Sequence, residues 1–372
     1  MLDQRWMWAQ LTSTFLRWAV DARGSVVGEI LRRLWTVPET QNMQEEAMTT
    51  IQPRRFQSVV VPLDGSPLAE QAIPLAQAIA ERSRGKLKLV LVHEPLIVME
   101  PGPDYHKVEL TMQKADREYL KSVTARLRDQ LGRSVSSAVL PGIPVAQTLA
   151  VYLREIGADL VVMTTHGRGG LRRAWLGSVT DQLIRIGEIP ILVIRPVEEG
   201  AQPTPALTEI MVALDGSPLA EATLEPAMAL AQLWDAEISL VQVVRPVAVT
   251  SPPHLTFPSS YSEQVTDIQR ATAQDYIKDV AERLRENGVR ATGVAVVGGA
   301  VPETLISLAA PERVSLMAVA THGLGGLKRV VLGSVADKLV RGAEVPVLVV
   351  RPTARPAGRK SEGKRLPAGA RA

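Results

Sequence analysis

The sequence predicts an α/β protein made of two tandem copies of one doubly wound parallel sheet. LDGSPLAE at 63–70 returns unchanged at 214–221, and THGRGGLRRAWLGSVTDQL at 165–183 returns as THGLGGLKRVVLGSVADKL at 321–339. A repeat of this length indicates a duplicated domain. Within each copy, short apolar runs without in-out alternation are separated by helical patterns. Such runs are typical of parallel strands that helices cover on both faces.

The first copy gives the expected order of elements. Apolar runs predict strands, and helical patterns fall between them. Each closing strand is followed by Arg-Pro, ending at Pro196 and Pro352, so we expect domains at 56–197 and 208–352 with a linker at 198–207. In the first copy the strands are predicted at 57–63, 87–93, 135–140, 159–164 and 190–195, and the helices at 67–83, 106–131, 144–157 and 178–187.

Two flanking segments belong to neither copy. Residues 1–55 hold four of the six tryptophans and two helical patterns. We expect a helical extension that docks on the protein's own domains or on a second subunit, with membrane contact by residues 1–35 as the alternative. Residues 353–372 are rich in Ala, Gly, Pro and basic side chains, which predicts a disordered basic tail.

Composition and charge exclude several classes of function. The chain of 372 residues has no cysteine, which excludes disulfides, thiolate catalysis and cysteine-ligated zinc. Of the net charge of +3, the tail at 353–372 supplies +5 and residues 1–55 supply +1, so residues 56–352 carry −3. This distribution argues against nucleic acid as a partner of the domains. No apolar run reaches the roughly 20 residues of a membrane span, and no signal-peptide pattern opens the chain. We therefore expect a cytoplasmic protein.

A glycine-rich loop follows the fourth strand of each copy and leads to Gly-Ser at the start of a helix. It covers residues 165–178 in the first copy and 321–334 in the second. Glycines let backbone N–H groups approach a ligand closely, and a helix N-terminus attracts anions. The pattern predicts a phosphate-binding site. Alternatively, Ser178 and Ser334 could cap their helices together with the aspartate three residues later.

The first strand of each copy ends at an aspartate, Asp64 or Asp215, followed by Gly-Ser-Pro. Ligands of open α/β sheets bind beyond the carboxyl ends of the strands, where the strand order reverses. If strands one and four are neighbours there, the aspartate and the glycine-rich loop face one crevice. The carboxylate could then hold a ribose hydroxyl or a metal ion on a phosphate. The alternative is that each aspartate caps its own turn.

These motifs together resemble the universal stress protein (UspA) family: the DGS after the first strand, the loop with nine residues before Gly-Ser, and the closing PVLVVRP. The resemblance covers nearly the whole length of both copies. It implies sheets of strand order 3-2-1-4-5, an ATP-binding loop, adenine contacts at the ends of strands one and two, and pairing through the closing strands at 190–195 and 346–351. The family's first loop glycine is replaced by Thr164 and Ala320.

The resemblance implies one set of nucleotide-binding residues in each copy. Neither His166 nor His322 has a catalytic or metal-ligand spacing around it, so no catalytic residue and no protein-held metal ion is predicted. The implied residues of the first copy are Pro62, Leu63, Asp64, Val92, Met163, Thr164, His166, Gly167, Gly177, Ser178, Val179 and Thr180. Those of the second copy are Ala213, Leu214, Asp215, Val243, Val319, Ala320, His322, Gly323, Gly333, Ser334, Val335 and Ala336.

The sequence therefore predicts an ATP-binding regulatory or sensory module of the stress response, with Mg²⁺ carried on the ATP phosphates. Expected partners are an adenine nucleotide, an unidentified protein, and a second copy, either within the chain or in a homo-oligomer. Two alternatives stay open. One is a nucleotide-free module that dimerises and binds partners, and the other is a slow ATPase.

Overall fold

The computed structural model describes residues 55–96, 104–131, 135–165, 176–196, 206–247, 259–309, 313–321 and 332–352. The expectations for the N-terminal extension, for the basic tail and for most of the linker lie outside these residues. None of the helices in the described part of the chain is long and apolar enough to cross a membrane.

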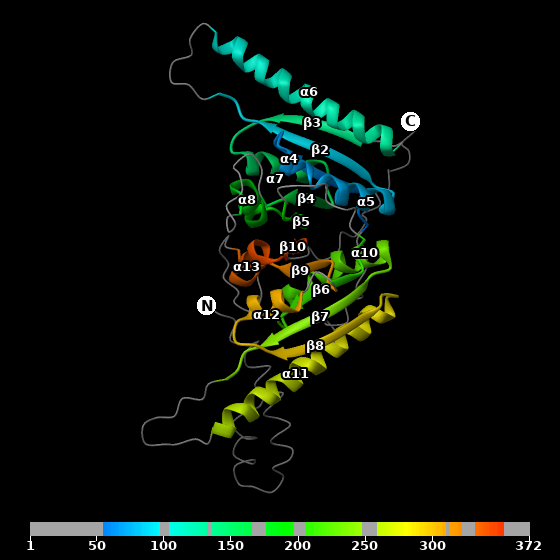
Figure 1. Cartoon of the computed structure of the whole chain (residues 1–372), viewed down its shortest axis with the longest axis vertical. Helices are drawn as coiled ribbons and strands as arrows, with labels where there is room; N and C mark the ends of the chain where they lie inside the picture. Colours follow the sequence, from blue (N-terminus) through cyan, green and yellow to red (C-terminus); the bar gives the residue numbers. More distant parts are fainter. Residues whose placement is uncertain are drawn as a thin grey trace, which may run out of the picture. The chain divides into compact units, whose positions relative to one another are not determined.

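In the part of the chain that the structure describes, each copy has five strands and five helices in the same order (Figure 1). The first copy comprises β1 (Ser58–Leu63), α4 (Pro67–Glu70), α5 (Ile73–Ser83), β2 (Lys86–His93), α6 (Tyr105–Leu131), β3 (Val135–Pro141), α7 (Val145–Glu155), β4 (Leu160–Thr164), α8 (Ser178–Ile186) and β5 (Ile191–Ile194). The second comprises β6 (Glu209–Leu214), α9 (Pro218–Glu221), α10 (Leu224–Trp234), β7 (Glu237–Val244), α11 (Ser259–Glu286), β8 (Ala291–Val297), α12 (Val301–Leu308), β9 (Leu316–Ala320), α13 (Ser334–Gly342) and β10 (Val347–Val350).

The single helix predicted at 67–83 is wrong, because the structure has two helices there, α4 and α5. Pro74 stands in the first turn of α5. Proline has no N–H to donate, and its ring collides with the carbonyl group four residues earlier, here that of Glu70. The backbone therefore makes a turn at Gln71 before the second helix starts. In the second copy α9 and α10 are likewise separate, and Pro226 stands in the first turn of α10, one position later than Pro74 in α5.

The strand order confirms the predicted fold class. The strands of the described segments form one sheet of ten in the order β3-β2-β1-β4-β5-β10-β9-β6-β7-β8, which is 3-2-1-4-5 in each copy. β1 lies between β2 and β4, and β6 lies between β7 and β9, all in parallel. Every residue of β4, β5, β9 and β10 is buried, as the continuous apolar runs predict.

The two copies meet at their closing strands. β5 and β10 pair antiparallel, with Leu192 opposite Leu348, so the sheet continues from β3 at the top of Figure 1 to β8 at the bottom. One buried apolar cluster includes residues of both copies. A second contact joins α5 to α10, where the Arg82 guanidinium lies 4.8 Å from the centre of the Trp234 ring and donates to the Leu233 carbonyl at 3.1 Å.

One residue of the predicted linker is buried at the start of the second copy. Leu207, placed by the sequence at the end of the linker, is only 2% exposed. It lies two residues before β6 and is one of the largest fully buried side chains. Packing of the second copy therefore begins at the last residue of the predicted linker.

Candidate functional site

The carboxyl ends of β1 and β4 lie side by side in the first copy, and those of β6 and β9 in the second. The reversal of strand order that the crevice argument required is therefore present in both copies. Asp64 and Asp215 directly follow β1 and β6, and each is partly exposed at this edge of the sheet. Both aspartates thus stand where open α/β sheets bind ligands.

Each aspartate also organises its own turn. The Asp64 Oδ1 atom accepts hydrogen bonds from the Ser66 backbone N–H at 2.9 Å and from the Ser66 hydroxyl at 2.7 Å. The same serine oxygen accepts from the Ala69 N–H at 3.2 Å and so caps α4. Asp215 and Ser217 repeat this arrangement at 3.0 and 2.6 Å. The turn-capping alternative is therefore correct for one carboxylate oxygen of each aspartate.

The helices that follow the glycine-rich loops begin without a side-chain cap. Gly177 is the N-cap of α8 and Gly333 that of α13, and neither can cap the helix with a side chain. The capping alternative for Ser178 and Ser334 is wrong, because both serines are the first helical residues and lie inside the helix. The first N–H groups of α8 and α13 thus lack the partner that a capping side chain would supply.

The acidic residue of each first turn is neutralised within the helix. Both carboxylate oxygens of Asp181 accept from the Arg185 guanidinium at 2.9 Å, and this bond to Asp181 raises the pKa of Arg185. Asp337 and Arg341 make the corresponding bond in α13 at 2.9 Å. The negative charge near each helix N-terminus is therefore paired and opposes a bound anion only weakly.

The two ends of each glycine-rich loop are held together by the backbone. The Gly177 N–H donates to the Thr165 carbonyl at 2.7 Å, and the Gly333 N–H donates to the Thr321 carbonyl at 2.8 Å. Each of these threonines in turn donates its N–H to the closing strand. The loop therefore leaves β4 or β9 and returns to the same point. His166, Gly167, His322 and Gly323 lie in the loops and outside the described residues.

The copies differ at the base of this loop. In the first copy, the Thr180 hydroxyl donates to the Thr164 carbonyl at 3.0 Å and ties α8 to the end of β4. In the second copy, Ala320 and Ala336 occupy the two positions, so this side-chain bond has no counterpart. The departure from the family pattern at Thr164 is thus coupled to a second residue, Thr180.

The structure brings most of the remaining predicted residues to the same edge of the sheet. Pro62 and Leu63 end β1 and pair with Val90 and Leu91 of β2, so Val92 stands one residue beyond that pair. The corresponding predicted residues of the second copy are at the ends of β6, β7 and β9 and at the start of α13: Ala213, Leu214, Val243, Val319 and Val335. Met163 ends β4 together with Thr164, and Val179 lies in the first turn of α8.

The donor set fits a metal ion that arrives with a phosphate ligand. Asp64 and Asp215 offer carboxylate oxygens, which Mg²⁺ prefers. Among the described residues, however, no three His, Asp or Glu side chains gather as a metal-ion site.

The identical segment LDGSPLAE also has a structural role at its last residue. Glu70 accepts from the Tyr119 hydroxyl at 3.0 Å and pairs with the Arg126 guanidinium, both from α6. Glu221 is bonded in the same way by Tyr276 at 3.0 Å and by Arg283 at 2.8 Å, both from α11. Burial and the neighbouring glutamate raise the pKa of both tyrosines. The short helix beside each candidate site is thereby tied to the longest helix of its copy.

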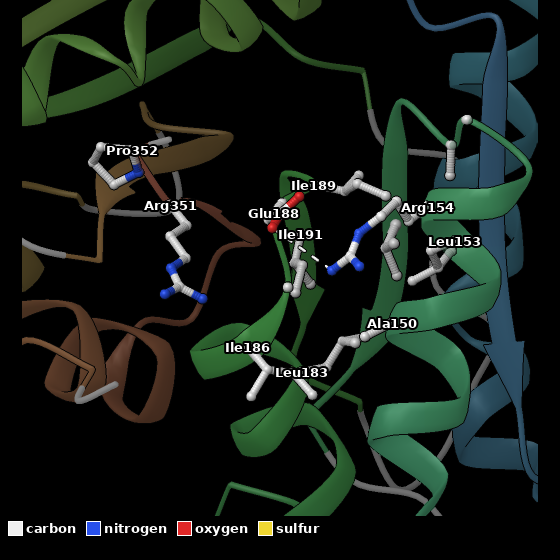
Figure 2. Close-up of a pocket in the computed structure, with 14 residues that line it drawn as sticks. Ala150, Leu153, Arg154, Leu183, Ile186, Glu188, Ile189, Ile191, Arg351 and Pro352 are labelled. Atoms are coloured by element: carbon white, nitrogen blue, oxygen red, sulfur yellow. Dashed lines mark ion pairs between the residues drawn. The ribbon is translucent and has the colours of Figure 1, made fainter. Parts of the chain in front are cut away.

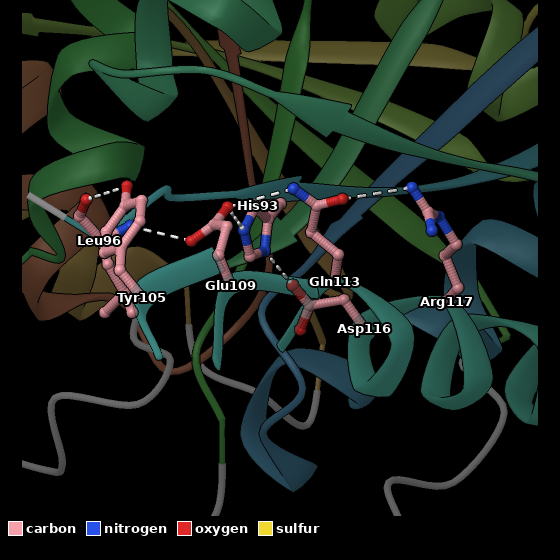
Figure 3. Close-up of polar contacts among 7 residues, drawn as sticks. All are labelled: His93, Leu96, Tyr105, Glu109, Gln113, Asp116 and Arg117. Carbon is pink, nitrogen blue, oxygen red and sulfur yellow. Dashed lines mark hydrogen bonds and ion pairs between the residues drawn. The ribbon is translucent and has the colours of Figure 1, made fainter. Parts of the chain in front are cut away.

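The sequence did not reveal a buried charged cluster at the end of β2. His93 lies between two carboxylates of α6, with Nδ1 2.6 Å from Asp116 and Nε2 2.8 Å from Glu109 (Figure 3). The sequence held one indication of this cluster, a difference between the copies: a histidine ends this strand in the first copy, and Val244 ends it in the second.

A cavity of about 670 Å³ lies at the opposite ends of the strands (Figure 2). Gly157 and Ala158, which precede β4, line it together with Glu188 and Ile189, which precede β5. Arg351 reaches it from the second copy and donates to the Arg185 carbonyl at 2.7 Å. The cavity therefore belongs to the junction between the copies and is separate from the candidate site.

Comparison with known proteins agrees with this architecture. The sequence profile of the universal stress protein family matches residues 55–195 and again residues 207–351. A universal stress protein of Mycobacterium tuberculosis is 28% identical over 308 residues, covering 80% of this chain and 98% of that protein. Another, from Mycolicibacterium smegmatis, is 26% identical over 298 residues, covering 79% of this chain and 97% of its own length.

Solved structures show the same fold. The crystal structure of a universal stress protein from Archaeoglobus fulgidus superposes with a TM-score of 0.59 at 16% identity, covering 80% of this chain and 99% of that one. The family profile accounts for more than half of the chain, in two consecutive matches that coincide with the two halves of the sheet. The chain belongs to the universal stress protein family, in its tandem form.

Proposed function

We propose that the protein binds ATP at the carboxyl edge of the sheet in each copy and acts as a regulatory module of the stress response. The phosphates would lie at the starts of α8 and α13, and the ribose beside Asp64 and Asp215. The adenine would lie against the ends of the first two strands of each copy, near Val92 in the first.

One observation carries the proposal. In both copies a glycine N-cap leaves the helix start without a side-chain partner, directly after a glycine-rich loop that closes on the end of the neighbouring strand. Unpaired N–H groups and the positive end of the helix dipole favour an anion. Both copies within the chain have this arrangement, although their loop sequences differ.

The described residues favour binding over rapid chemistry. One oxygen of the aspartate at each site already accepts two hydrogen bonds from its own turn, so that oxygen is poorly placed as a general base. Mg²⁺ bound with ATP would neutralise phosphate charge at the site. The proposed partners are the nucleotide, an unidentified protein that recognises the nucleotide-bound state, and a second chain. We also propose that the protein is located in the cytoplasm, which cell fractionation tests.

Isothermal titration calorimetry of ATP into the purified protein, with and without Mg²⁺, tests the proposal. We expect about two ATP molecules per chain, one for each helix N-terminus. Gly177→Val removes the first site and Gly333→Val the second, because a β-branched side chain at the N-cap blocks access to the N–H groups and is a poor cap.

A matched pair of variants separates loss of binding from loss of folding. Serine caps helices at least as well as glycine, so Gly177→Ser and Gly333→Ser should keep or slightly raise the melting temperature. The new hydroxyl accepts from the N–H groups that the phosphates need, so each variant should still lose one site. Saturable ATP binding that both serine variants leave unchanged would overturn the assignment, and no binding at all would favour the nucleotide-free alternative.

A further inference from the structure

Both ring nitrogens of His93 face carboxylate oxygens, an arrangement that suits a doubly protonated ring. It is the last residue of β2 and 3% exposed, and each ring nitrogen faces a carboxylate oxygen of α6 at 2.6 or 2.8 Å (Figure 3). A neutral imidazole has one N–H and can donate to only one of them. The second contact would then set a nitrogen lone pair against a carboxylate. The observed arrangement of His93, Glu109 and Asp116, called here the His93 cluster, therefore fits the imidazolium ion.

The His93 cluster fixes the chain just beyond β2. Glu109 uses its second oxygen to accept from the Leu96 N–H at 3.1 Å, and the Tyr105 hydroxyl donates to the Leu96 carbonyl at 2.8 Å. Gln113 donates to the first oxygen of Glu109 at 3.0 Å. The residues that follow β2 are thus tied to the start of α6 by Glu109 and Tyr105, and Glu109 is itself held to the end of β2 by His93.

The second copy makes the same backbone tie without any charge. The alignment that places residue 63 on residue 214 places His93 on Val244 and Leu96 on Val247. In this copy the Val247 N–H donates to the Thr266 hydroxyl oxygen at 3.1 Å, which replaces the bond to Glu109. Val244 packs with Ala273 and Ala295 in a small buried apolar cluster.

The tyrosine and arginine bonds to Glu70 and Glu221 fix the correspondence of the long helices. Tyr119 corresponds to Tyr276, and the same spacing places Glu109 on Thr266 and Asp116 on Ala273. All three members of the His93 cluster are therefore replaced together by uncharged residues. The backbone beyond the second strand is thus bonded to the long helix in both copies, with titratable groups in the first copy and without them in the second.

Among the described residues, no other charged group contacts the imidazole. The groups facing it from α6 are Glu109 and Asp116, and the residue opposite it on β3 is Pro141, which does not titrate. Arg117 approaches only through Gln113, at 3.4 Å from its amide oxygen. Among the described residues, β1, α5 and α7, which also pack against β2, add no charged contact to the ring.

We propose that the His93 cluster is a proton-dependent tie that holds the start of α6 and Leu96 to the end of β2 in the first copy alone. Loss of the His93 proton releases the tie, while the Thr266 bond of the second copy is unaffected. If ATP binds as proposed above, the affinity of the first site follows the same proton, because Val92 is the neighbour of His93. That last step alone rests on the proposed function.

The sign follows from the contacts. Burial disfavours the charged ring, but the hydrogen bonds to Asp116 and Glu109 outweigh it, so the pKa of His93 is raised above its ordinary 6.5. The tie is then fully present below 6.5 and is lost as the pH rises through the higher folded-state value. The bonds from His93, Leu96 and Gln113 lower the pKa of Glu109 from 4.5, so its contribution is lost only in acid below that value.

Hydrogen–deuterium exchange with residue resolution, read by NMR on the nucleotide-free protein, tests the tie. Protection of the Leu96 amide, corrected for intrinsic exchange, should fall about tenfold between about pH 6 and about pH 9, the equivalent of one net hydrogen bond to a charged group. Val247 serves as the internal control, and its corrected protection should stay constant. Equal protection of Leu96 at both pH values would overturn the proposal.

A second measurement does not depend on any variant folding. The His93 ring, followed by NMR of the wild-type chain, should titrate above 6.5; titration at or below that value would also overturn the proposal.

The variant His93→Val with Glu109→Thr and Asp116→Ala adopts the residues of the second copy, and it should make Leu96 protection independent of pH. Continued pH dependence there would assign the effect to another group.

A nucleotide arm distinguishes failure of the tie from failure of the proposed function. In the Gly333→Ser background, where only the first site is open, the ATP dissociation constant should rise with pH as Leu96 protection falls. A constant affinity alongside falling protection would refute the coupling and leave the tie intact. Absence of ATP binding at every pH would count against the proposed function only.

Discussion

Asp64 and Ser66 form a coupled pair whose contribution to stability follows from their bonds. Ser66→Ala removes the N-cap of α4, which costs about 1 kcal/mol, and the 2.7 Å hydrogen bond to the Asp64 carboxylate. A bond to a charged group contributes about 1.5–3 kcal/mol when buried. Since Asp64 is partly exposed, we expect about 1 kcal/mol from this bond. Ser66→Ala should therefore lower the free energy of unfolding by about 2 kcal/mol.

A double-mutant cycle isolates the bond. Urea denaturation of Ser66→Ala, Asp64→Ala and the double variant should show a total loss smaller than the sum of the single losses by about 1 kcal/mol. Additivity within about 0.3 kcal/mol would refute the reasoning about the turn. Calorimetry on the same proteins asks about the ligand: Asp64→Ala should weaken ATP binding at the first site more than Ser66→Ala does. Equal affinities would leave Asp64 with the turn as its only role.

Three further changes test the bond between α6 and α4, the difference between the two candidate sites at Thr164 and Thr180, and the pairing of β5 with β10. Tyr119→Phe should lower the free energy of unfolding by about 1–2 kcal/mol, because it removes a donor to a charged glutamate that keeps its arginine; urea denaturation measures this. Thr164→Ala with Thr180→Ala gives the first site the residues of the second, and calorimetry should show its ATP affinity moving towards that of the second site. Leu192→Cys with Leu348→Cys, in a chain that has no other cysteine, should form an intramolecular disulfide because the two residues are directly opposite in an antiparallel pair.

Each of these has a clear contrary result. An unchanged urea midpoint for Tyr119→Phe would show that the hydrogen bond from Tyr119 to Glu70 does not stabilise the protein. An unchanged first-site affinity in the double threonine variant would show that those residues do not cause the asymmetry. Covalent dimers of the double cysteine variant on a non-reducing gel, in place of the cross-linked monomer, would mean that the closing strands pair between chains.

The sequence predicts the fold well because its strongest signals are local and repeated. Continuous apolar runs predict strands that are buried on both faces, and all four strands nearest the junction are buried throughout. The prediction fails at Gln71, where a helical pattern continues across a break caused by Pro74. Pro74 stands in the interior of the predicted helix, where a proline is expected to break or kink it, so the break could have been predicted from the sequence.

The candidate site is only partly predictable, because the same residues serve both local structure and ligand binding. Asp64 caps a turn and also stands at the crevice, and no pattern in the sequence separates the two roles. The role of Ser178 was settled by where the helix begins, one residue earlier than a capping serine requires. The His93 cluster was missed because its members lie on a strand and a helix, and only the fold brings them together.

The number of ATP molecules bound per chain tests the central claim most directly. Calorimetric titration should give about two for the wild-type protein, about one for Gly177→Ser or Gly333→Ser, and none for the double variant, with melting temperatures unchanged or raised. Wild-type stoichiometry in the double serine variant, or no saturable binding by the wild-type protein, would contradict the claim that the two uncapped helix starts bind the phosphates.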